Sequence, residues 1–109
     1  MTEFSHTVTA TAPGHTVVAV TGELDTHTAG RFKLALLDLV EDGARLVVDL
    51  SDLDFIDSSG LSVFIAVHKR SVPRGAEVVL DRVPPFLSRI LTITGLDQVI
   101  PVLRVAEAS

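Results

Sequence analysis

The chain lacks several residue types, and their absence excludes or disfavours particular functions. It has no cysteine, which excludes disulfides and thiolate chemistry. That absence fits a reducing compartment, and we expect a cytoplasmic protein. Tryptophan and tyrosine are also absent. These residues are common aromatic anchors of permanent interfaces, so their absence favours transient partners.

Positive charge is scarce as well. Nine Lys and Arg residues stand against 14 Asp and Glu, which gives a net charge of -5, and the basic residues form no cluster. A direct nucleic-acid partner is therefore not expected. The first twenty residues lack a basic start followed by an apolar core, and no apolar run is long enough to span a bilayer. We expect neither a signal peptide nor a membrane partner.

The residues that are present indicate a folded domain. Hydrophobic residues make up 47% of the 109 positions, which argues against disorder. This length predicts one domain over residues 1–109. Alternating or mostly apolar runs predict strands at residues 4–11 (half-buried), 16–21, 45–50, 77–80 and 99–105. Helical spacing predicts helices from Thr26 or Thr28 to a cap at Gly43, over residues 59–71, and from Pro84–Pro85 to Gly95.

The order of these elements is β-β-α-β-α-β-α-β, with an irregular connection expected at residues 51–56 and an edge or bulge at Pro101. Such alternation predicts an α/β fold with a mixed sheet of about five strands and helices packed on it. Asp25 and Asp57 each follow a strand and precede a helix. Function gathers at the carboxyl ends of strands in open α/β sheets, so we expect both carboxylates at one edge.

The most informative stretch is Asp-Ser-Ser-Gly-Leu at residues 57–61. Either Asp57 or Ser58 can cap the following helix, which is the commoner role for such residues. Ser58 is also a candidate phospho-acceptor. A phosphate there would meet the positive end of the helix dipole and the carboxylate of Asp57. That conflict is suited to a charge switch.

Gly60 falls in the first turn of the same helix, where glycine costs about 1 kcal/mol relative to alanine. Two explanations stay open: close approach of another backbone or a kinase, and tight packing against a strand. Asp25 is either an ordinary turn residue or part of a phosphate pocket.

Other chemistry finds little support in the sequence. The acidic run Asp49, Asp52, Asp54 and Asp57 does not match a calcium-binding loop, and the four histidines are scattered. Neither a nucleophile elbow nor a phosphate-binding loop occurs. We therefore predict no enzyme activity, no metal and no cofactor. Asp49 within a strand could be an aspartyl-phosphate acceptor, but the paired acidic residues of such sites are missing.

Two motifs carry a family resemblance. Gly-Glu-Leu-Asp at residues 22–25 and Phe-Ile-Asp-Ser-Ser-Gly-Leu at residues 55–61, with the strand Leu-Val-Val-Asp-Leu at 46–50 between them, closely resemble the STAS domains of bacterial anti-sigma factor antagonists. The resemblance covers nearly the whole chain. The two motifs together are fairly specific, and the region from Pro84 onward departs from the clearest motifs.

The resemblance implies a partner-switching protein. Its unphosphorylated form would bind an anti-sigma factor, which is also a serine kinase of the histidine-kinase-like ATPase superfamily, and so release a sigma factor. The kinase would phosphorylate Ser58, and a metal-dependent serine phosphatase would reverse this. Asp25 and Asp57 match the acidic neighbours of the acceptor, and Ser59 matches a second hydroxyl that is not the primary acceptor. These residues and Gly60 are the expected switch-site neighbours and partner-binding residues.

Three alternatives remain open at this point. One is a STAS scaffold or adaptor that binds without phosphorylation in a lipid-transport or sensory assembly. Another is a receiver-like protein phosphorylated on Asp49. The third is a small enzyme at the strand edge.

Overall fold

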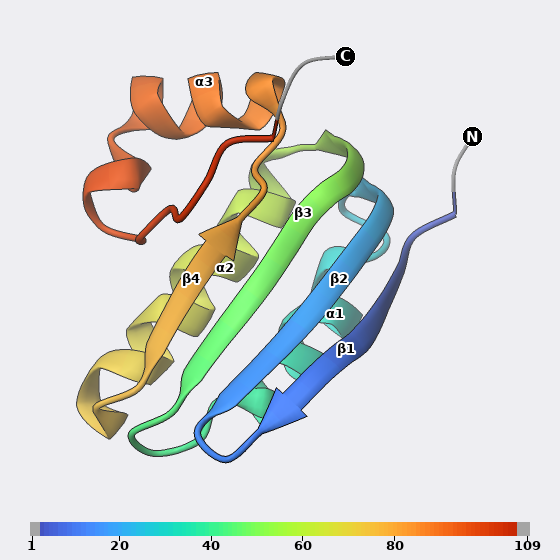
Figure 1. The fold of residues 1–109 in the computed structure, drawn as a ribbon. Helices are drawn as coiled ribbons and strands as arrows, with labels where there is room; N and C mark the ends of the chain where they lie inside the picture. The colour runs from blue at the N-terminus through green and yellow to red at the C-terminus, as the bar shows by residue number, and fades with distance from the viewer. Residues whose placement is uncertain (1–2, 107–109) are drawn as a thin grey trace.

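Residues 3–106 are described by a computed structural model, which forms one sheet with helices packed against it (Figure 1). The strands are β1 (Ser5–Ala12), β2 (His15–Leu24), β3 (Arg45–Ile56) and β4 (Glu77–Asp81). The helices are α1 (Ala29–Leu39), α2 (Ser58–Ser71) and α3 (Pro85–Thr94), with 3-10 turns η1 (Val72–Arg74) and η2 (Leu96–Gln98). The expected mixed α/β fold is confirmed.

The spatial order of the strands is β1-β2-β3-β4. β1 pairs antiparallel with β2, whereas β2, β3 and β4 run parallel. Parallel strands put their carboxyl ends at one edge, and there Leu24 of β2 lies in register with Ile56 of β3. The connections into α1 and α2 therefore begin side by side (Figure 1).

The core lies between the sheet and the helices α1 and α2. Alternate residues of β2, such as Val18 and Val20, point into it, as expected for a strand with one covered face. Phe32 of α1 and Phe64 of α2 meet edge to face with ring centroids 6.5 Å apart. Both phenyl rings are fully buried, so they tie the two helices together beneath the sheet.

Four element predictions were wrong in detail, and the last strand is the fourth of them. Residues 51–56 are not irregular, because β3 continues through them by pairing with Thr21–Leu24 of β2 across two register shifts. The first strand is exposed along its whole length rather than half-buried, since it is the outer strand of the sheet. Helix α1 ends at Leu39 with Val40 as its C-cap, and Gly43 lies in the turn beyond it with φ of 71°.

The predicted last strand, residues 99–105, is reduced to two isolated bridges that pair Leu80 with Val102 and Val83 with Val105. Two features explain this. Pro101 has no backbone N–H to donate. Arg82 adopts a positive φ of 51°, which breaks the extended path of β4. The segment still lies along the outer edge of β4, where a proline is tolerated.

An ion pair fastens this segment to the sheet. The Arg104 guanidinium donates hydrogen bonds of 3.0 and 2.8 Å to the two carboxylate oxygens of Asp81. Asp81 is only 8% exposed. The hydrogen bonds from Arg104 hold the pKa of Asp81 below its usual range, against the opposing effect of burial.

Candidate functional site

Asp57 caps helix α2. Its Oδ1 accepts hydrogen bonds from the backbone N–H of Ser59 at 2.9 Å and of Gly60 at 3.2 Å. These are two of the N–H groups that a helix start leaves without partners. Of the two cap candidates in the sequence, Asp57 therefore takes the role, and Ser58 becomes the first helical residue.

The Ser58 side chain is exposed. Within residues 3–106 its hydroxyl makes no hydrogen bond, while its backbone carbonyl accepts one from the Ser62 hydroxyl at 2.9 Å. The adjacent Ser59 differs, because it is half-buried and its Oγ lies 3.4 Å from the Oγ1 of Thr26. The two neighbouring hydroxyls thus occupy distinct environments at the mouth of α2.

Asp25 organises the turn between β2 and α1. Its Oδ1 accepts from the backbone N–H of His27 at 2.9 Å and of Thr28 at 3.2 Å. In return the Thr28 Oγ1 accepts from the Asp25 N–H at 3.0 Å. This reciprocal pair has the form of a capping box. Thr28, one of the two cap candidates in the sequence, is the N-cap residue of α1, but its side chain makes no cap hydrogen bond and instead bonds back to Asp25.

Thr26 joins the two turns, and sequence reasoning missed this role. Its Oγ1 lies 3.4 Å from Asp57 Oδ2 as well as from Ser59 Oγ. The expectation that Asp25 and Asp57 follow strands ending at the same edge is confirmed by these contacts and by the strand register. The signal for this role in the sequence was a hydroxyl residue directly after Asp25. The neighbouring strand β3 ends just before Asp57, so this hydroxyl is within reach of the Asp57 carboxylate.

Gly60 is buried, and its environment explains the glycine. A Cβ there would lie 2.5 Å from Ile56 Cγ1, 2.9 Å from Leu24 Cγ and 3.0 Å from the Leu24 carbonyl oxygen. Contacts under 3.0 Å are not tolerated by packed carbon atoms. Of the two explanations that the sequence left open, tight packing against the strand ends is the one this geometry supports.

Other candidates fall outside this site. Asp49 is half-buried on β3, where it accepts from the Ser51 N–H at 3.0 Å and lies 3.4 Å from the Arg82 guanidinium. It serves as an ion-pair partner there. In the described part of the chain, no three His, Asp or Glu side chains gather closely enough to hold a metal ion.

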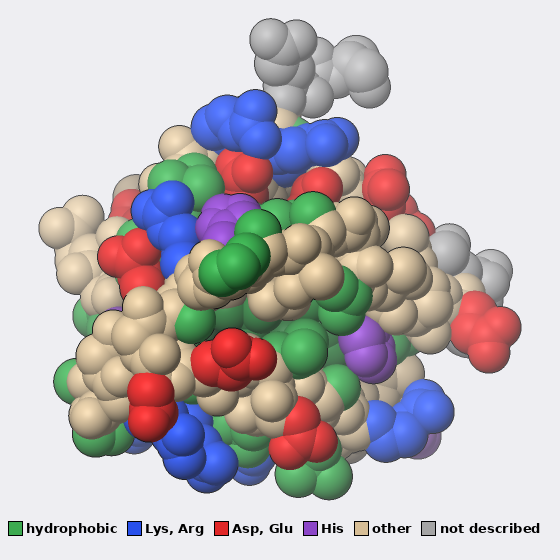
Figure 2. Space-filling model, turned by 60° about the horizontal axis from the view of Figure 1, so that its bottom comes forward, with side chains coloured by type: hydrophobic (Ala, Val, Ile, Leu, Met, Phe, Trp, Pro, Cys, Tyr) green, Lys and Arg blue, Asp and Glu red, His purple; other side chains and the backbone are tan. Residues whose placement is uncertain are grey.

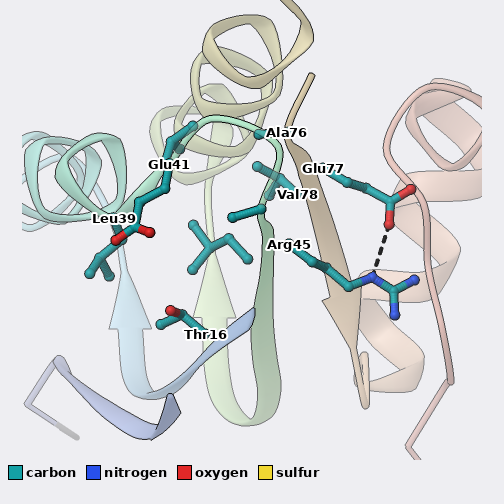
Figure 3. A pocket seen from close by; sticks show the side chains of 10 residues that line it. Thr16, Leu39, Glu41, Arg45, Ala76, Glu77 and Val78 are labelled. Atoms are coloured by element: carbon teal, nitrogen blue, oxygen red, sulfur yellow. Dashed lines mark hydrogen bonds and ion pairs between the residues drawn. The ribbon is translucent and has the colours of Figure 1, made fainter. Parts of the chain in front are cut away.

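A small cavity lies at the opposite end of the sheet, where β3 and β4 begin (Figure 3). Arg45 and Glu77 form an ion pair of 2.9 Å beside it. Its volume of about 10 Å³ is far below the several hundred Å³ of ordinary ligand pockets. It offers no room for a small-molecule ligand.

Charge on the surface is mixed. On the face shown in Figure 2, basic and acidic side chains are interspersed rather than gathered into a patch of one sign. No helix within residues 3–106 is both long and apolar enough to cross a bilayer.

Comparison with known proteins agrees with the family resemblance of the sequence motifs. The family model for the STAS domain matches residues 6–108. The chain belongs to the STAS domain family. An anti-sigma-B factor antagonist of Listeria monocytogenes is 37% identical over 84% of this chain and 81% of its own length. The Bacillus subtilis protein of that name is 33% identical over 83% of each chain.

A solved structure extends the comparison to the fold. The anti-sigma factor antagonist from Mycobacterium paratuberculosis superposes with a TM-score of 0.77 at 31% identity. The match covers 94% of this chain and 87% of that one. The relatives of this STAS domain thus include anti-sigma factor antagonists in both sequence and structure.

Proposed function

We propose that this STAS domain is an anti-sigma factor antagonist whose binding is controlled at Ser58. In its unphosphorylated form it binds an anti-sigma factor that is also a serine kinase, and the sigma factor is released. The observation that carries the proposal is Ser58 itself, an exposed hydroxyl without a hydrogen-bond partner among the described residues, directly after the capping carboxylate of Asp57. The names of the relatives agree with this function.

Charge accounts for the switch. Phosphorylation of Ser58 adds about -1.5 to -2 charges near neutral pH. Two unit charges 4 Å apart interact by roughly 4 kcal/mol at an effective dielectric constant of 20, and exposure to water reduces this to about 1–2 kcal/mol. A loss of 1.4 kcal/mol weakens binding about tenfold. One phosphate beside Asp57 is therefore enough to weaken, by about tenfold, the binding of a partner whose contact surface is acidic or apolar.

In this proposal the chain is a substrate rather than an enzyme. The kinase places the phosphate on Ser58, and a metal-dependent serine phosphatase of the same cytoplasm removes it. Asp57 and Asp25 hold the two turns in shape, and Ser59 contributes to the surface that the partner contacts.

Capture and labelling test the proposal. Wild-type protein immobilised on resin should retain an anti-sigma factor from the source cells, identified by mass spectrometry. Incubation of that factor with the wild-type chain and Mg-ATP should place one acid-stable phosphate on a peptide that contains Ser58. Ser59→Ala, the matched control, should keep the label, and Ser58→Ala should lose it. Label that persists in Ser58→Ala would refute the assignment.

A further inference from the structure

Two serines stand side by side at the start of α2, and a kinase must choose between them. Ser58 is exposed and its hydroxyl is free of hydrogen bonds within the described residues. Ser59 is half-buried, with its N–H donating to Asp57 Oδ1 at 2.9 Å and its Oγ 3.4 Å from Thr26 Oγ1. The contact with Thr26 is what holds the Ser59 hydroxyl toward the neighbouring turn.

Thr26 is exposed but lies in a hydrogen-bonded turn. Asp25, directly before it, and Thr28, two residues after it, form the reciprocal capping pair that shapes this turn. From that turn the Thr26 hydroxyl reaches both Asp57 Oδ2 and Ser59 Oγ at 3.4 Å. Thr26 therefore links the turn that follows β2 to the start of α2 through one hydroxyl.

We propose that Thr26 is a positioning residue that directs phosphorylation to Ser58 and away from Ser59. This inference rests on the proposed function. In the transfer, a serine Oγ forms a bond to the γ-phosphorus of Mg-ATP, the bond to the bridging oxygen breaks, ADP leaves, and the hydroxyl proton passes to a base of the kinase. Ser59 must first break its contact with Thr26 and rotate outward, whereas Ser58 needs no such step.

The test uses a background in which only the disfavoured serine remains. Three proteins are compared with the captured kinase and Mg-ATP: Ser58→Ala, Ser58→Ala with Thr26→Val, and Ser58→Ala with Thr26→Ser. Valine matches threonine in shape but lacks the hydroxyl, and serine restores the hydroxyl. We expect Ser59 to be labelled faster in the valine protein than in the other two, by about twofold to tenfold, because the net contribution of one hydrogen bond corresponds to roughly that factor.

Two further measurements keep the outcomes separate. Thr26→Val alone should be labelled on Ser58 at the wild-type rate, which shows that the variant is folded and recognised. Its Ser59 Hα–Hβ couplings in NMR should change from those of one fixed rotamer to averaged values. Unchanged couplings, or equal Ser59 label in all three proteins, would overturn the inference and leave the proposed function intact. Absence of label from the wild-type chain would overturn both.

Discussion

Gly60 provides a sharp test of the packing beneath the switch site. Ala has a higher helix propensity than Gly, so Gly60→Ala should gain up to about 1 kcal/mol if only the helix mattered. The added Cβ, however, would lie 2.5 Å from Ile56 Cγ1 and 2.9 Å from Leu24 Cγ. Leu24 is 0% exposed and Ile56 is 7% exposed, so neither side chain has free space to enter.

The steric clash of the added Cβ should outweigh the gain in helix propensity. Overpacking a filled core costs about 1–3 kcal/mol. A Cβ contact of 2.5 Å belongs to the upper part of that range, about 2–3 kcal/mol, so after a propensity gain of about 1 kcal/mol Gly60→Ala should lower the free energy of unfolding by about 1–2 kcal/mol. Gly30 in the first turn of α1 is the matched control, because a Cβ there meets nothing within 4 Å. Gly30→Ala should therefore raise stability by up to about 1 kcal/mol.

Urea unfolding of the two variants beside the wild type measures both effects. The transition midpoint should fall for Gly60→Ala and rise for Gly30→Ala, with similar m values in all three proteins. If Gly60→Ala were stabilised as much as Gly30→Ala, the close approach of α2 to the ends of β2 and β3 would be wrong.

Two other predictions concern the cap and the terminal ion pair. Asp57→Ala should lower the free energy of unfolding by about 1 kcal/mol, while Asp57→Asn keeps most of it because the amide oxygen still accepts; equal losses in thermal unfolding would contradict the cap. Arg104 lowers the pKa of Asp81, so the carboxylate adds stability that is present above its unfolded pKa of about 3.9 and is lost as pH falls through the lower folded pKa. Arg104→Gln should reduce stability at pH 7, and its difference from the wild type should shrink as pH falls towards 3, because the variant lacks the hydrogen bonds that lower the pKa of Asp81. Urea unfolding between pH 7 and 3 measures this, and a difference that does not change with pH would rule out the role.

Much of the fold followed from local patterns. One such pattern is the helical stripe that contains Phe32 and Leu36, and another is the almost wholly apolar run at the start of β3. Together they predicted helices packed on a sheet, as the structure shows. The cap at Asp57 was one of two options, since Asp and Ser cap almost equally well. The structure decides between them, because the backbone N–H groups of Ser59 and Gly60 donate to the Asp57 carboxylate.

The parts that could not be predicted depend on distant partners. Asp52 and Asp54 are residues typical of a loop, yet this stretch remains a strand because β3 accommodates one extra residue at each of two register shifts and keeps pairing with β2. The positive φ of Arg82 follows no residue preference and breaks the predicted last strand. The link from Thr26 to Asp57 crosses 31 positions of sequence, so only the assembled sheet brings the two residues together.

Affinity for the captured anti-sigma factor tests the charge switch most directly. Ser58→Asp and Ser58→Asn have nearly the same shape and differ by one negative charge. Aspartate in a first helical turn is compatible with the helix dipole, so unfolding should not cause a loss of binding. Calorimetric titration should show Ser58→Asn within a few-fold of the wild type and Ser58→Asp weaker by about tenfold or more. Equal affinities for the two variants would contradict the account.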